Sequence, residues 1–303
     1  MLYDAIIVGG SFAGLAAALQ LARARKNILV LDAGLPRNRF ASHSHGVLAM
    51  DGRSGSDILA DALSQLRAYP TAKIYAGKVA SVTPEGGHFV VELEGGARWF
   101  TSRRVLLATG VRDVLPDITG LKERWGSTVL HCPYCHGYEL EQGAIGVLGI
   151  SPMSVHLAAM VADWGDVTLF TNNAFAPTED ERRILALRKV TVEPVAIDAL
   201  EGTAPALTIR LMDGRRLPLR GLFAGAGIEQ ASPLAGQLGC AMDETPMGPL
   251  LRTDGFKQTT VPGVYAAGDA ASMRQSISLA IGDGMLAGVS LHQSLIAEET
   301  AHA

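Results

Sequence analysis

The chain has 303 residues, of which 48% are hydrophobic and 18% are charged, with 34 glycines and a net charge of −4. This length favours two compact units, and the composition is typical of a soluble α/β protein rich in glycine turns. The slightly acidic balance argues against nucleic-acid binding, and three cysteines are too few for a secreted disulfide framework. We expect a cytoplasmic protein without membrane attachment, because the N-terminus lacks a signal-peptide pattern and no stretch approaches roughly 20 apolar residues.

The N-terminal segment has the pattern of a dinucleotide-binding βαβ unit. Residues 5–8 are predicted to form a buried strand, residues 15–25 a helix and residues 27–31 a second strand. Glycines in the first turn allow a tight bend and close packing of the helix, whose N-terminus would face a pyrophosphate. The candidate cofactor-binding residues of this unit are Gly9, Ser11, Phe12, Ala13, Gly14 and Asp32, where Ser11 replaces the usual middle glycine and Asp32 would accept from a ribose hydroxyl.

Two further segments end an apolar strand on a turn of small residues. Residues 104–110 form the first of them and residues 261–270 the second. Between the N-terminal unit and the first of these segments, residues 73–100 contain short β-rich runs separated by glycine pairs. These runs predict a small antiparallel layer on the first domain.

Residues 131–139, with the sequence His-Cys-Pro-Tyr-Cys-His-Gly-Tyr-Glu, place two thiols two residues apart between histidines. Such a pair can close a disulfide at a helix start, where the helix dipole and an imidazole favour the thiolate. The remaining cysteine, Cys240, is predicted to be a small buried hydrophobic residue.

The βαβ pattern recurs after the dithiol motif. We expect a strand over residues 144–148, a turn over 149–154, a helix over 155–164 and a strand over 166–170. Residues 190–220 predict a second antiparallel layer with a hairpin turn at Asp213 and Gly214. The sequence therefore predicts a second nucleotide-type domain inserted into the first.

In this order, the strand–turn segments and the dithiol motif resemble the flavoprotein disulfide reductases, and among them the low-molecular-weight thioredoxin reductases. The resemblance covers nearly the whole chain. It implies an α/β fold with two Rossmann-like dinucleotide-binding domains, each with a small antiparallel β-layer. Residues 1–115 and 246–303 would form a discontinuous FAD-binding domain, and residues 116–245 an NAD(P)H-binding-like domain that carries the redox motif.

The same resemblance implies the remaining FAD contacts. Asp269 would hold the ribitol and phosphate side of FAD, and the helix that opens near Gln275 and Ser276 would point its N-terminus at the flavin and stabilise the anionic reduced form. The loop over residues 36–46 would bring His45 and Gly46 near the flavin and Arg37 or Arg39 near the adenosine end, or it is simply a solvated loop. The candidate cofactor-binding residues of these segments are His45, Gly46, Thr109, Gly110, Gly268, Asp269, Gln275 and Ser276.

Two departures from the thioredoxin reductases favour a different branch of the family. His136 follows the second cysteine where those enzymes carry an acidic residue, and residues 171–173 read Thr-Asn-Asn where they carry a His-Arg-Arg run for NADPH. Losing two charge-assisted contacts would weaken NADPH binding by on the order of 10² to 10⁴. Residues 132–139 resemble the dithiol oxidases of the gliotoxin and holomycin pathways, which close a disulfide in a small molecule and pass the electrons to oxygen.

By that resemblance, Cys132 would exchange with a small-molecule dithiol, Cys135 would face the FAD and His136 would act as the base. The alternatives are an NAD(P)H-dependent thioredoxin reductase-like enzyme with a thioredoxin-like protein partner and a non-enzymatic redox-sensing flavoprotein. The motif also fits c-type haem attachment, which would require export, and a zinc site, for which the chain offers few further cysteines, so we expect no metal. The family further implies a homodimer.

Overall fold

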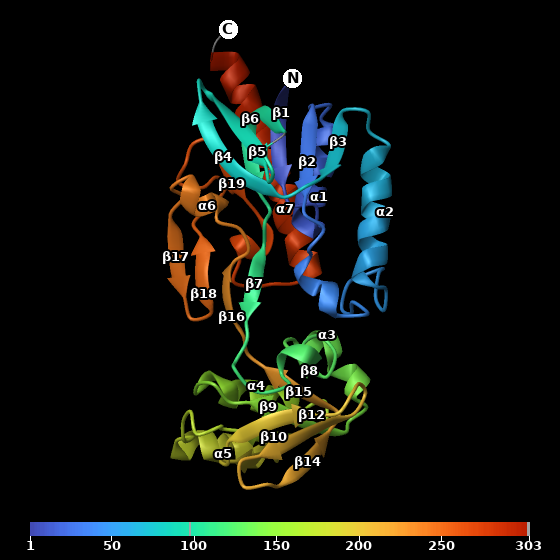
Figure 1. Ribbon diagram of the computed structural model, residues 1–303, viewed down its shortest axis with the longest axis vertical. Coiled ribbons are helices and arrows are strands. Elements are labelled where there is room, and N and C mark those ends of the chain that lie inside the picture. The colour runs from blue at the N-terminus through green and yellow to red at the C-terminus, as the bar shows by residue number, and fades with distance from the viewer. Residues whose placement is uncertain (97, 302–303) are drawn as a thin grey trace. The chain divides into compact units, whose positions relative to one another are not determined.

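The computed structural model describes residues 1–96 and 98–301 (Figure 1). The chain divides into two compact units. The first comprises Met1–Arg39, Ser56–Asp113 and the chain from Ile228 onward, and the second comprises Phe40–Gly55 and Val114–Gly227.

The first unit is built on a seven-stranded sheet in the order β3-β2-β1-β6-β5-β4, with β19 paired to β6. The strands β1, β2, β3, β6 and β19 run parallel, whereas β4 and β5 form an antiparallel extension on β6. The strands of this sheet are β1 (Leu2–Val8), β2 (Ile28–Asp32), β3 (Ala72–Ala76), β4 (Val79–Glu85), β5 (His88–Leu93), β6 (Trp99–Leu107) and β19 (Val264–Ala266).

Both faces of this sheet are covered, which explains why residues 5–8 of its central strand are apolar. In β1, Ile6 and Val8 belong to one core cluster, whereas Ala5 and Ile7 belong to another that includes alanines of α1 and α7. The helices of this unit are α1 (Phe12–Arg23), α2 (Gly55–Arg67), α6 (Leu234–Gln237) and α7 (Ile277–Ala301). Two strand pairs complete it: β7 (Val111–Val114) with β16 (Gly227–Gln230), and β17 (Met242–Thr245) with β18 (Gly248–Leu251).

The second unit repeats the parallel architecture on a smaller scale. Its five-stranded parallel sheet has the order β11-β10-β9-β15-β8, and a separate antiparallel sheet has the order β12-β13-β14. The strands are β8 (Val129–Leu130), β9 (Ala144–Leu148), β10 (Asp166–Phe170), β11 (Thr191–Glu193), β12 (Ile197–Glu201), β13 (Leu207–Leu211), β14 (Arg216–Leu219) and β15 (Gly221–Ala224). The helices are α3 (Pro133–His136), α4 (Met153–Val161) and α5 (Glu179–Leu187).

The expected fold class, with two Rossmann-like domains and an antiparallel layer on each, is confirmed. The two units differ from the expected domain bounds in three places, the smallest being residues 114–115, which lie in the second unit. Residues 228–245 lie in the first unit, because Leu234, Ala235 and Cys240 are buried in the same core cluster as β1 and β6. Residues 40–55 lie in the second unit, with the dithiol motif.

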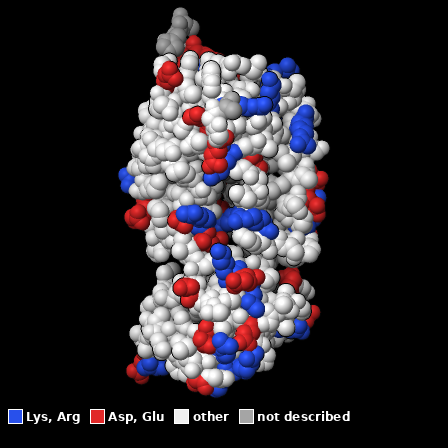
Figure 2. Space-filling model, in the orientation of Figure 1, with Lys and Arg blue, Asp and Glu red and all other residues white. Residues whose placement is uncertain are grey.

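The surface carries charges of both signs. Figure 2 shows Lys and Arg side chains interspersed with Asp and Glu on the face that it presents. Among the described helices, none is long and apolar enough to cross a membrane.

Candidate active site

The N-terminal turn is a close-packed cradle that only glycine can form. A Cβ atom at Gly14 would lie 1.8 Å from the carbonyl oxygen of Gly9, and one at Gly9 would lie 2.2 Å from the carbonyl oxygen of Ala108. Gly9 also has a φ of 110°, which side chains rarely adopt. The amide of Gly10 donates to Oδ1 of Asp32 over 3.1 Å. The two glycines thus have the packing roles expected of a dinucleotide-binding turn.

The helix α1 begins at Phe12, three residues before the expected start. Ser11 is its N-cap residue, with extended backbone, and Phe12, Ala13 and Gly14 form its first turn. The first amides of a helix have no partner within the helix, and together with the helix dipole they favour an anion. The residues of this turn that are predicted to bind the cofactor therefore form a helix start. Such a helix start fits the diphosphate of a dinucleotide such as FAD.

The other two strand–turn segments lie at the same edge of the first sheet. β6 pairs in parallel with both β1 and β19, so the carboxyl ends of the three strands meet there. Gly110 follows β6 with a φ of 67°, and Gly268 follows β19 with a φ of 76°. A Cβ atom at Gly268 would lie 2.8 Å from Cβ of Ala13. The structure brings together the residues predicted from three distant parts of the chain.

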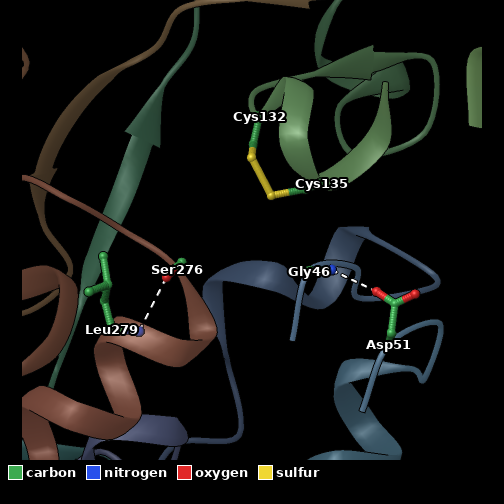
Figure 3. The surroundings of a disulfide bond; sticks show 6 residues. All are labelled: Gly46, Asp51, Cys132, Cys135, Ser276 and Leu279. Carbon is green, nitrogen blue, oxygen red and sulfur yellow. Dashed lines mark hydrogen bonds between the residues drawn. A yellow bond between two sulfur atoms is a disulfide. The ribbon is translucent and has the colours of Figure 1, made fainter. Parts of the chain in front are cut away.

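The residues predicted to contact FAD at the start of α7 are linked to the turn after β19 by the side chain of Arg37. Ser276 accepts a hydrogen bond from the amide of Leu279 over 3.2 Å and so caps the helix (Figure 3). Gln275 and Asp269 both bind the guanidinium of Arg37. Sequence reasoning missed this link, because only the folded chain brings residue 37 to residues 269–275.

The dithiol motif lies in the second unit. Cys132 and Cys135 form a disulfide with their Cα atoms 5.3 Å apart (Figure 3). Cys132 is the N-cap residue of the short helix α3, and Pro133 occupies its first position, where a missing amide proton costs nothing. The amide of Gly137 donates to the carbonyl oxygen of Pro133 over 2.7 Å and closes the helical turn. The spacing of the cysteines therefore places both sulfurs at one helix start, as expected.

His136 is the last residue of α3 and is half-buried. Burial lowers the pKa of its imidazole below the ordinary 6.5; Glu139 raises that pKa, and His45 and His131 lower it further. Because the lowered pKa keeps the ring neutral near pH 7, His136 is suited to accept a proton.

The loop that follows Arg39 contributes to the surroundings of the motif. Nε2 of His45 lies 3.4 Å from Glu139, and its Nδ1 lies 3.8 Å from Asp51. The amide of Gly46 donates to Asp51 over 2.7 Å (Figure 3). His45 and Gly46 thus belong to the unit that carries the disulfide, whereas the other predicted cofactor residues belong to the first unit. Glu139 was missed as a functional residue, although its position three residues after His136 is a usable signal.

The glycine turn of the second βαβ unit satisfies its own backbone groups. The hydroxyl of Ser154 accepts from the amide of Ile150 over 3.2 Å, and Pro152 has no amide proton to offer. A Cβ atom at Gly149 would lie 2.9 Å from the ring of Phe175. At the end of β15, the Ile150 side chain lies 3.1 Å from where a Cβ of Gly225 would stand. The second glycine turn is therefore closely packed, and the Ser154 hydroxyl already binds one of its amides.

The strand end next to this turn carries the uncharged residues Thr171, Asn172 and Asn173. Thr171 follows β10 and is buried. Asn172 uses Oδ1 to accept from the amide of Ile197 over 2.8 Å. Among the described residues of the chain, no three histidines, cysteines or carboxylates are grouped so as to hold a metal ion.

A disulfide at a helix start, together with two dinucleotide-binding folds, defines the class of this protein. The model of the pyridine nucleotide-disulphide oxidoreductase family matches residues 3–284. The chain belongs to this family and is an oxidoreductase. The recognised resemblance to thioredoxin reductases is thereby confirmed.

The chain is similar to proteins of this class over nearly its whole length. It is 32% identical to thioredoxin reductase tcpT of Claviceps purpurea, covering 97% of this chain and 95% of that protein. The crystal structure of an oxidoreductase from Agrobacterium tumefaciens is 50% identical, covers 98% of this chain and 99% of its own, and has a TM-score of 0.94. The crystal structure of HlmI is 36% identical, covers 99% and 94%, and has a TM-score of 0.90.

Proposed function

We propose that this protein is an FAD-dependent oxidase of small-molecule dithiols that uses the Cys132–Cys135 disulfide and oxygen as the final acceptor. The observation that carries the proposal is the placement of His136, a half-buried histidine with a lowered pKa, at the end of the helix that begins with this disulfide. The proposal includes a homodimer, as the resemblance implies, and cytoplasmic residence.

The exchange chemistry balances without another reagent. A substrate thiolate attacks Sγ of Cys132, the bond between the two cysteines breaks, and Cys135 leaves as a thiolate. The second substrate thiolate then attacks the substrate sulfur held by Cys132, the mixed disulfide breaks, and Cys132 leaves as a thiolate. The substrate leaves as a disulfide, having lost two electrons and two protons, and the protein pair is reduced. His136 takes a proton from an incoming thiol, because its neutral ring can accept one near pH 7.

When bound, FAD would take two electrons from the reduced pair and oxygen would accept them in turn as hydrogen peroxide. Support for FAD comes from the cradle at Gly9 and Gly14 and from the Gly268 turn beside Ala13, which fit a dinucleotide. Further support for the acceptor comes from the second unit, where the Ser154 hydroxyl already binds the amide of Ile150 in the glycine turn and positions 172 and 173 carry no basic residue. An enzyme that uses oxygen needs no hydride donor at that turn.

A thioredoxin reductase-like activity is the second candidate, since several relatives carry that name, among them tcpT and sirT of Leptosphaeria maculans. It would run the electrons in the opposite direction, from NAD(P)H to a thioredoxin-like protein. The missing basic residues at positions 172 and 173 argue against it.

The two candidate functions differ in which compound reduces the bound flavin, which would colour the protein yellow. We expect anaerobic addition of a small dithiol to bleach the flavin absorbance, NADH and NADPH to leave it unchanged, and air to restore it with release of peroxide. Bleaching by NADPH alone would overturn the oxidase assignment in favour of the reductase.

A single substitution tests the roles of the two cysteines. Cys132→Ser should retain FAD and show a long-wavelength charge-transfer band between the Cys135 thiolate and the flavin. Cys135→Ser is the matched control and should lack the band. A band in the second variant alone would reverse the two roles.

A further inference from the structure

Arg37 lies in a polar loop but is tied into the first unit by its guanidinium. It opens a short 3₁₀ helix, Arg37–Phe40, after β2. Its side chain is 19% exposed, and those of its partners Asp113 and Asp269 are 10% and 23% exposed. A charged cluster this far from solvent requires a structural or functional reason, because partly buried charges are costly unless they are paired.

The contacts of Arg37 join three distant parts of the chain. Its Nε donates to both carboxylate oxygens of Asp113, at 3.1 and 3.2 Å, and Nη2 donates to the same group. Nη1 donates to Oδ2 of Asp269 over 2.9 Å and to Oε1 of Gln275. Only the planar guanidinium, with five donors in a fixed fork, can serve these three partners at once.

A second set of contacts fixes the turn that carries Asp269. The amide of Gly268 donates to Oδ2 of Asp283 over 2.8 Å, and the other oxygen of Asp283 pairs with Lys257. Arg37 therefore fixes the side chain of Asp269, while Asp283 fixes the backbone just before it.

The charges explain why a cation is needed at this place. Two carboxylates share one guanidinium, so the cluster keeps a net negative charge. Burial by itself would lower the pKa of Arg37, but hydrogen bonds and attraction from Asp113 and Asp269 more than offset it and raise that pKa. Without Arg37, two uncompensated carboxylates would stand beside a site proposed for a diphosphate, and like charges repel.

We propose that Arg37 is a positioning residue of the cofactor site, which orients Asp269 and Gln275 and neutralises Asp113 and Asp269 so that a dinucleotide diphosphate binds nearby. This inference rests on the proposed FAD function. It gives Arg37 a different role from the adenosine contact expected of the loop, since the residue acts through the carboxylate and the amide of its neighbours.

FAD titration of the apoprotein, followed by flavin fluorescence at several salt concentrations, tests this role. We expect Arg37→Gln to weaken FAD binding by about 10- to 100-fold at low salt, the range of one to two lost charge-assisted contacts. The defect should shrink as salt is added, because screening reduces repulsion between the carboxylates and the diphosphate. A purely structural defect would not depend on salt in this way.

Rescue variants make the test specific. Arg37→Lys keeps the charge but loses the fork, so it should bind FAD with intermediate affinity. Arg37→Gln combined with Asp113→Asn should recover at least about threefold of the lost affinity, because one unpaired carboxylate is gone. Arg252→Gln is the matched control, since Arg252 forms an exposed pair with Asp243 in the same unit, and it should bind FAD like the unmodified protein.

The outcomes separate this inference from the proposed function. If the unmodified protein binds no FAD, the proposed function fails. If it binds FAD, and Arg37→Gln binds equally well or shows a salt-independent defect that Asp113→Asn does not relieve, the positioning role of Arg37 is refuted while the proposed function stands.

Discussion

His136 has two neighbours that change its pKa in opposite directions. Glu139 raises it and His45 lowers it. Glu139→Gln should therefore lower the pKa of His136 further, so that the ring stays neutral at lower pH. In a plot of the rate of dithiol oxidation against pH, the fall of the rate on the acid side should then move to lower pH. His45→Gln should move the same fall to higher pH. Stopped-flow measurement of disulfide reduction between pH 5 and 8 checks both, and shifts in the same direction for the two variants would contradict this account.

Cys240 differs from the motif cysteines in its surroundings. It is 7% exposed, and Sγ lies 3.5 Å from the hydroxyl of Thr259. Burial raises the pKa of its thiol, with the hydrogen bond to Thr259 acting in the opposite direction. The predicted role as a small buried hydrophobic residue agrees with its place in the core.

We expect the reduced native protein to expose the Cys132 and Cys135 thiols to a chromogenic disulfide reagent while Cys240 stays protected. A third thiol should react only after denaturant is added, since the protected thiol is both buried and protonated. Cys240→Ala should remove the denaturant-dependent thiol and leave the others. Rapid reaction of three thiols in the folded protein would show that this part of the core opens readily.

At the level of elements, the packing of α1 against α7 fixes the position of the N-terminal glycine turn. A Cβ atom at Gly284 would lie 2.0 Å from the carbonyl oxygen of Ala13, and one at Gly288 would lie 2.7 Å from that of Ala17. The glycines let the two helices approach until backbone meets backbone. The start of α1 is therefore positioned by α7.

Two glycines of α7 separate this packing effect from helix propensity. Gly284→Ala should destabilise the first unit by about 1–3 kcal/mol, because the methyl group forces the helices apart. Gly282→Ala, on the same helix with open space around the new methyl group, should instead stabilise it by about 0.5–1 kcal/mol. Urea unfolding, followed by a signal from the first unit, measures both changes in the free energy of unfolding. Equal effects of the two substitutions would exclude the packing explanation.

Elements with local signals could be predicted from the sequence. The second βαβ unit matches its expected strands at 144–148 and 166–170, because apolar strands alternate there with a glycine turn and a helix. The hairpin β17–β18 could not be predicted, since the exposed polar residues of β17 have no clear alternation and its neighbour Cys240 packs on strands far away in sequence. The helix α1 begins three residues before the predicted start, because its first turn consists of residues that the glycine motif predicts as a loop.

The candidate site was predictable only as separate motifs. The glycine turns and the cysteine pair carry recognisable spacings. The partners of Arg37 lie 76 and 232 residues away, and the link between His45 and Glu139 is also long-range, so no local pattern reports them. Such contacts form only when segments far apart in the sequence meet in the folded chain.

At the scale of the whole molecule, the described core clusters keep to one unit each. Two large clusters and a small one lie in the first unit, and the other two lie in the second. Each unit thus has a hydrophobic core of its own, which favours separate unfolding transitions.

We expect calorimetry of the apoprotein to resolve two transitions. Added FAD should raise the midpoint of only one of them, by binding the folded first unit and not its unfolded form. Limited proteolysis at intermediate temperature identifies which unit unfolds first. A single transition that moves as a whole on adding FAD would contradict independent unfolding of the units.

The contact of α1 with α7 also sets an order of events during synthesis. The N-terminal turn leaves the ribosome early, but the helix that holds it in place is made only after the whole second unit. Residues 114–227, which contain the cysteine pair, emerge complete before that helix exists. A growing chain therefore finishes its disulfide-bearing unit before it can complete its cofactor cradle.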